Sequence, residues 1–263
     1  MNIFSILGFI MASAVLFIGL RLSTDDLAMF WDVPSVFIVL GGTLASTAIA
    51  FQLDRILVLF KTFFKIIFQN SVSKNSGIIV EIIKVGDSYR KGTQLEALAA
   101  KVSDPFLKEG LIMVADGIIK SEQILKILED RANNQDVERR EEANKLKLIG
   151  KFAPAFGMMG TTIGMIVLLA NLGGADAVKK VGPAMGICLI TTFYGVVIAN
   201  LAFIPVAENL INHSKAQYLK DSIIIEGIRL IMLKENPVIL AEELNSFLSP
   251  KERINWKDIV TKG

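Results

Sequence analysis

The sequence predicts an all-α membrane protein, with four transmembrane helices in two hairpins and a helical cytoplasmic domain. Of its 263 residues, 52% are hydrophobic. Four stretches of 18 to 27 residues contain no Asp, Glu, Lys, Arg or His, although the chain has 28 Lys and Arg and 26 Asp and Glu elsewhere. A helix of about 20 apolar residues crosses the hydrocarbon core of a bilayer. This segregation of charge excludes a soluble domain, a disordered chain and a secreted disulfide scaffold.

The positions of the charges divide the chain into four parts. These are a first transmembrane hairpin (1–53, with spans 3–20 and 33–53), a cytoplasmic helical domain (54–151), a second transmembrane hairpin (152–207) and cytoplasmic C-terminal helices (208–263). Basic residues near the spans are concentrated in the middle part, whereas the two short connections carry only Arg21, Lys179 and Lys180. Because Lys and Arg favour the cytoplasmic side, we expect both termini to be cytoplasmic.

Local signals predict helices in the cytoplasmic parts. Residues 55–69 have the pattern of a basic amphipathic helix at the membrane surface. A long helix is expected to run from 121 into the third span, and another from the fourth span to about 233. Further helix starts or stops are marked by Gly92, a capping-box pattern at Thr93-Gln94-Leu95-Glu96, Asp104-Pro105, Asn236-Pro237 and Ser249-Pro250-Lys251-Glu252.

Composition argues against several functions. The net charge of +2 gives no basic footprint for nucleic acid, and we expect no nucleic-acid partner. The single cysteine and single histidine cannot form a disulfide or a metal cluster within one chain, so we expect no cofactor. Two small-residue patterns, Gly160-x-x-x-Gly164 and Gly182-x-x-x-Gly186, predict close helix packing rather than chemistry.

Hydroxyl and proline residues in the second hairpin each allow two interpretations. Thr161, Thr191 and Thr192 could supply oxygen ligands to a partly dehydrated cation, or bond to a backbone carbonyl four residues back. Pro154 and Pro205 stand at the inner ends of the two spans. Each removes a helix hydrogen bond and could form a static bend or a hinge.

The most informative feature of the spans is the lack of an ionisable side chain. Ion-coupled membrane proteins hold and release their ion with such a group near the midplane. The chain therefore moves no ions, or a partner supplies the carboxylate.

The motifs together resemble the stator A-subunit family of the bacterial flagellar motor, MotA and PomA. The similarity covers nearly the whole chain and keeps the order of its motifs. They are Asp32-Val33-Pro34-Ser35 with 39–43 (VLGGT), Arg90-Lys91-Gly92 with Glu96, 153–161 (APAFGMMGT), 182–185 (GPAM), 189–195 (LITTFYG), Ala199-Asn200 and Pro205.

This resemblance implies a set of partners and roles. Family members form a homopentamer in the bacterial inner membrane around a dimer of a single-span, MotB/PomB-like B subunit, which supplies the ion-binding aspartate. Ion flow then drives the rotor protein FliG through cytoplasmic charges. By motif, the rotor-facing charges would be Arg90, Lys91 and Glu96. Pro154 and Pro205 would couple the membrane region to the cytoplasmic domain. The ion path would be lined by Thr161, Thr191 and Thr192. Glu96 has a rival role in the capping box.

The threonines favour sodium as the transported ion. Sodium-type relatives similar to PomA carry hydroxyls at the positions of Thr161 and Thr192, whereas proton-type relatives more often carry small apolar residues. A proton-driven stator is the alternative. An ExbB/TolQ-like energiser of outer-membrane transport is a second one, although those relatives have three spans. A membrane enzyme would need a nucleophile–base pair or metal cluster that the spans lack, and a stand-alone channel would lack an ionisable residue.

Overall fold

The structure is a computed structural model that describes residues 3–51, 75–173 and 177–255. Throughout these ranges the chain is helical or connecting, with no strand, as the sequence predicts. The chain divides into two compact units. The first unit comprises Met1–Ser71 and Arg140–Ile211, and the second comprises Val72–Arg139 and Asn212–Gly263. The predicted amphipathic helix at 55–69 lies outside the described residues.

Apolar helices make up the first unit. It contains α1 (Ile3–Ser23), η1 (Leu27–Phe30), α2 (Val33–Val36), the π-helical turn η2 (Phe37–Gly41), α3 (Gly42–Ala50), part of α8 (Ser121–Asn171), α9 (Ala177–Val197), the π-helical turn η3 (Ile198–Phe203) and the start of α10 (Ile204–Met232). In the described residues, three helical stretches are long and apolar enough to cross a membrane, namely Leu27–Ala50, Ser121–Asn171 and Val178–Met232. Leu7–Ser23 is a shorter apolar helix, so the count of four spans stays a prediction.

Capping fixes where the second predicted span begins. Asp32 is the N-cap of α2, and its carboxylate accepts hydrogen bonds from the Ser35 hydroxyl and, at 2.8 Å, from the Ser35 N–H. Pro34 stands in the first turn, where its missing N–H costs nothing. The helical segment within the predicted span at 33–53 therefore begins directly after Asp32, and its described part ends at Ala50.

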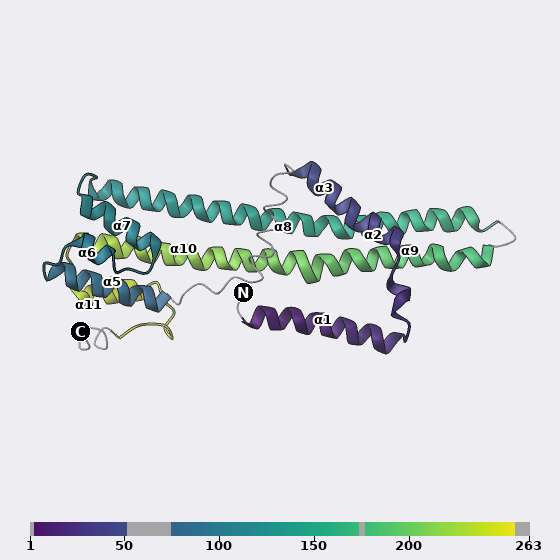
Figure 1. Ribbon diagram of the computed structural model, residues 1–263, viewed down its shortest axis with the longest axis horizontal. Helices are drawn as coiled ribbons and strands as arrows, with labels where there is room; N and C mark the ends of the chain where they lie inside the picture. The colour runs from purple at the N-terminus through teal and green to yellow at the C-terminus, as the bar shows by residue number, and fades with distance from the viewer. Residues whose placement is uncertain (1–2, 52–74, 174–176, 256–263) are drawn as a thin grey trace. The chain divides into compact units, whose positions relative to one another are not determined.

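The second unit is a helical bundle with its own core. Figure 1 shows α5 (Asn75–Arg90), α6 (Leu95–Ala99), α7 (Pro105–Asp116) and α11 (Pro237–Asn245) gathered around the end of α10. Side chains that are less than 2% exposed fill its interior: Ile79, Ile82, Ile83, Leu107, Leu111, Leu128, Ile223, Ile224, Ile228 and Leu230. A methyl group added at Gly227 would lie 2.7 Å from the side chain of Ile82, so α10 packs directly on α5.

Several predicted helix boundaries are confirmed. Asp104 caps α7 by accepting from the N–H groups of Phe106 and Leu107, and Asn236 caps α11 by accepting from Val238. The long helix predicted from 121 into the third span is α8, a single 51-residue helix. The continuation of the fourth span is also observed, because α9, η3 and α10 follow one another to Met232.

The capping box predicted at Thr93 is wrong. The N-cap of α6 is Gln94, and it makes no side-chain capping bond. Thr93 instead closes the end of α5, where its N–H donates to the Ser88 carbonyl at 3.1 Å next to Gly92, whose φ is +96°. This helix-ending motif uses the residue that the box would need. The start predicted at Ser249 is also wrong, since residues 249–252 form a turn.

Buried polar pairs join the helices of the second unit. The Lys220 ammonium donates to the Asp104 carboxylate at 2.6 Å, and Ser214 donates to Asp136 at 2.8 Å. Asp221 is 1% exposed and accepts a bond from Gln217 on its own helix. Burial raises the pKa of Asp221, against the opposing effects of Gln217 and nearby cations.

This burial makes stability depend on pH. A carboxyl whose folded pKa is raised favours the fold while protonated, and that contribution is lost as pH rises through the folded pKa. We expect Asp221→Asn to raise the midpoint of thermal unfolding at pH 7, with a gain that shrinks toward pH 4. Exposed Asp130→Asn is the control and should show no such pattern. A gain for Asp221→Asn that is equal at every pH would contradict this account.

Candidate ion-path site

Glycines bring α8 and α9 into direct contact. A methyl group built on Gly160 would lie 2.5 Å from Cβ of Thr191, and one on Gly164 would lie 2.5 Å from Sγ of Cys188. One on Gly195 would lie 2.6 Å from the carbonyl oxygen of Ala153. Any larger residue at these positions would separate the helices. The predicted packing role is thus observed for Gly160 and Gly164, whereas Gly182 and Gly186 have open space around them in this chain.

Two threonine hydroxyls meet across this contact. The Oγ1 atoms of Thr161 and Thr192 are 2.6 Å apart. Both hydroxyls also lie within bonding distance of the Cys188 carbonyl oxygen, at 3.0 and 3.2 Å. A hydroxyl that donates its one hydrogen to a carbonyl or to its neighbour keeps oxygen lone pairs free. Since Thr192 is exposed and Thr161 is half-buried, their oxygen atoms form a small polar site on an apolar surface.

Thr191 occupies a different environment from Thr192. Its side chain is fully buried between the helices, and its hydroxyl donates to the carbonyls of Ile187 at 2.7 Å and Cys188 at 3.2 Å. Thr162 is exposed and bonds to Met158 on its own helix. The structure therefore brings Thr161 and Thr192 together and places Thr191 in the packing contact beside them.

Both predicted coupling prolines lie in continuous helical segments. Pro154 is inside α8, and its Cα would be 3.0 Å from a methyl group on Gly195 of α9. Pro205 is in the first turn of α10, directly after the π-helical turn η3. Because proline lacks an N–H and η3 departs from α-helical hydrogen bonding, the helix is irregular at this point. The same helices share a small apolar core, formed by Ala143, Leu146, Ile149, Val206, Ala207 and Leu210. Lys147 and Glu208 also form an ion pair at 2.6 Å.

Tyr194 has a structural role that the sequence did not reveal. Its hydroxyl donates to the Phe30 carbonyl at 2.5 Å and accepts from the Asp32 N–H at 3.4 Å. It thereby fixes α9 against the start of α2. A tyrosine within an apolar span is the only signal of this contact, because a buried phenol usually finds a hydrogen-bond partner.

The charges predicted to face the rotor lie on the second unit. Arg90 and Lys91 are exposed at the end of α5, where Lys91 pairs with Asp87 at 2.5 Å. Glu96 is exposed in the first turn of α6. The start of α6 has no side-chain capping bond, so the structure gives no support to the rival capping role of Glu96.

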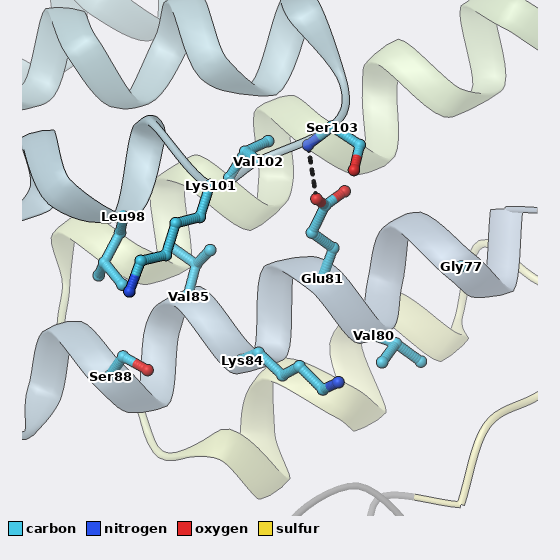
Figure 2. Close-up of a pocket in the computed structure, with 10 residues that line it drawn as sticks. All are labelled: Gly77, Val80, Glu81, Lys84, Val85, Ser88, Leu98, Lys101, Val102 and Ser103. Atoms are coloured by element: carbon cyan, nitrogen blue, oxygen red, sulfur yellow. Dashed lines mark hydrogen bonds between the residues drawn. The ribbon is translucent and has the colours of Figure 1, made fainter. Parts of the chain in front are cut away.

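An open cleft of about 530 Å³ lies between α5 and the segment around α6. Figure 2 shows Glu81 pointing toward Ser103, and its carboxylate accepts a hydrogen bond from the Ser103 N–H at 2.7 Å. Lys84 and Lys101 also line the cleft. Its other lining residues are Gly77, Val80, Val85, Ser88, Leu98 and Val102. The lining includes neither His nor Cys. Likewise, no cluster of three or more His, Cys, Asp or Glu that could hold a metal occurs in the described residues.

The fold and this site define a multi-pass membrane protein with a small polar site between two closely packed helices. Residues 98–221 match the MotA/TolQ/ExbB proton channel family. Motility protein A of Borreliella burgdorferi is 32% identical over 256 residues, which cover 96% of each chain. Chemotaxis protein PomA of Vibrio alginolyticus is 27% identical and covers 96% of this chain and 98% of that protein. The chain therefore belongs to the MotA/PomA family.

A solved structure agrees with this assignment. The flagellar MotAB stator complex from Bacillus subtilis contains a chain that superimposes with a TM-score of 0.83 at 25% identity, covering 95% of this chain and 97% of that one. The relatives are named as motility and channel proteins rather than enzymes. The predicted helical membrane fold and the family are thus confirmed.

The packing of α8 on α9 can be tested by substitution. Gly160→Ala should destabilise the purified chain by about 1–3 kcal/mol, because the added methyl group overlaps Thr191. Gly186→Ala on α9 meets open space and should not lower the unfolding midpoint, since Ala favours the helix more than Gly does. Equal tolerance of the two changes would show that Gly160 does not set the contact.

Proposed function

We propose that this chain is the A-type stator subunit of a bacterial flagellar motor. It assembles as a homopentamer around a dimer of a MotB/PomB-like subunit in the inner membrane, with both termini in the cytoplasm, and turns ion flow into torque on FliG. The observation that supports this most strongly is a paired hydroxyl site in spans that contain no ionisable side chain. Such a site can pass an ion but cannot bind and release one by titration.

The missing carboxylate is the argument for the B subunit. The Bacillus subtilis relative is named as part of a MotAB stator complex, so that relative works with a second protein. An aspartate from a partner helix that approaches α8 and α9 would meet the hydroxyl pair. The apolar, exposed surfaces of α1, which include Phe9, Met11 and Phe17, would face lipid or neighbouring copies.

Sodium is the ion that we propose, with a proton as the alternative. Dehydrating sodium requires replacement oxygens, and Thr161 Oγ1, Thr192 Oγ1 and the Cys188 carbonyl oxygen are grouped within hydrogen-bond distance of one another. A proton held on a carboxylate needs no such group. Thr191 contributes by packing its side chain against Gly160 of α8, while its hydroxyl is committed to carbonyls of its own helix.

Force transmission would use the exposed charges of the second unit. Arg90, Lys91 and Glu96 supply charges of both signs on α5 and α6. Pro154 and Pro205 lie on α8 and α10, and both helices continue from the first unit into the second. An ExbB/TolQ-like role is less well supported, because motility protein A matches 96% of the chain end to end.

A motility experiment tests the function. The chain, expressed with the B subunit of its own cell, should restore rotation in cells that lack both stator subunits. Cells that remain immotile while the pair is inserted in the membrane would count against the stator function.

The ion site has its own test. Thr192→Ala should raise the sodium concentration for half-maximal rotation speed by roughly two- to tenfold, the effect of losing one polar contact. Thr162→Ala is the matched control, because that hydroxyl is exposed and bonds only to Met158. Rotation that is independent of sodium in the wild-type chain would refute sodium and favour the proton.

A further inference from the structure

Thr161 of α8 and Cys188 of α9 each donate a hydrogen bond to the backbone of the other. The Cys188 thiol donates to the Thr161 carbonyl at 3.3 Å, and the Thr161 hydroxyl donates to the Cys188 carbonyl at 3.0 Å. Both bonds cross between two helices that lie side by side in Figure 1. A single bond would leave the helices free to rotate about it, whereas two reciprocal bonds between the same residues fix the rotation as well as the height of α9 against α8.

Cys188 occupies a space that a glycine provides. Its side chain is buried, and its sulfur would lie 2.5 Å from a methyl group on Gly164. Because that methyl group would displace the sulfur, Gly164 allows the thiol to reach the Thr161 carbonyl. A thiol behaves as a small apolar group with a weak S–H donor. It can therefore lie in an apolar span and still make one directed contact.

The Cys188 carbonyl also lies beside both hydroxyls of the polar site. The oxygen atoms of Thr161 and Thr192 are 3.0 and 3.2 Å from it, and 2.6 Å from each other. The Thr161 hydroxyl has a second acceptor at 3.1 Å, the Gly157 carbonyl of its own helix. Since a hydroxyl has one hydrogen, Thr161 donates either within α8 or across to α9. A thiol bond that keeps Cys188 close to Thr161 favours the bond across to α9.

We propose that Cys188 is a positioning residue of the ion path, whose thiol bond to the Thr161 carbonyl holds the hydroxyls of Thr161 and Thr192 at the separation that a cation needs. This inference rests on the proposed function in naming an ion as the ligand of the hydroxyl pair. Without the thiol bond, Thr161 contacts Cys188 only through a hydroxyl that can return to its own helix. The two hydroxyl oxygens then separate more readily, and the ion binds less tightly.

Infrared spectroscopy of the purified chain tests the thiol bond itself. The chain has one cysteine, so its S–H stretching band reports Cys188 alone. We expect this band below the frequency of a free alkyl thiol in an apolar solvent, because a hydrogen bond weakens the S–H bond. Gly164→Ala should shift the band toward the free frequency, whereas Gly186→Ala, which meets open space, should leave it in place. A wild-type band at the free-thiol frequency would overturn the proposal.

The sodium response of the complex with the B subunit tests the positioning role. Cys188→Ala should raise the sodium concentration for half-maximal rotation speed by about two- to fivefold, the effect of losing one weak hydrogen bond. Cys188→Ser retains a donor and should return this concentration close to the wild-type value. Ala184→Gly is the matched control, because it removes a buried methyl group beside Gly164 and leaves the hydroxyls untouched. It should lower the unfolding midpoint without changing the sodium response.

The outcomes separate this role from the proposed function. A sodium-dependent wild type with an unchanged sodium response in Cys188→Ala would overturn the positioning role alone. A wild type whose speed does not depend on sodium would count against sodium as the ion. Proton flux through the reconstituted complex is then compared, and it should be two- to fivefold slower in Cys188→Ala, as for the loss of one weak hydrogen bond; equal flux would overturn the positioning role. A wild-type complex that restores no rotation would instead count against the stator function.

Discussion

The close approach of α8 and α9 is the contact on which the membrane unit depends. Glycine at 160, 164 and 195 lets side chains and carbonyls of one helix lie against the backbone of the other. That approach sets the rotation of α9, and thereby turns Thr192 toward Thr161 while Thr191 is enclosed. A small increase in the distance between the helices would separate the hydroxyl pair, because hydrogen bonds between oxygen atoms span only about 2.5–3.0 Å. The packing of the two helices and the geometry of the hydroxyl pair are therefore one property of this sequence.

A second constraint is the cost of charge in hydrocarbon. An unpaired ionised side chain at the bilayer centre is unfavourable by several kcal/mol, roughly 2.5–3.5 on insertion scales. This chain avoids the cost by using hydroxyls and backbone carbonyls in its spans and keeping carboxylates and amines outside them. The polar site that results is permanently neutral. In the proposed function such a site could accommodate an ion but has no titratable group of its own, which agrees with the naming of the Bacillus subtilis relative as part of a MotAB stator complex.

Local features of the fold could be predicted from the sequence, whereas features set by packing could not. Asp104 and Asn236 act on their own helix starts, so their roles were visible in the order of residues. The prediction of a capping box at Thr93 failed because Thr93 suits both the start of α6 and the end of α5. The structure uses it at the end of α5. Thr191 is buried and Thr192 is exposed because of how α9 is rotated against α8. Two neighbouring threonines in a sequence do not reveal that rotation. The left-handed backbone of Lys234, just after α10, could not be foreseen, since the usual residue at such a helix end is glycine.

The central claim is that the titratable group of this ion path belongs to another protein. Sodium flux into liposomes tests it most directly, with the chain reconstituted alone and then together with its B subunit under the same gradient. The account predicts background flux for the chain alone and flux above background for the complex, abolished when the aspartate in the B-subunit span is replaced by asparagine. Sustained sodium flux through the chain alone would contradict it.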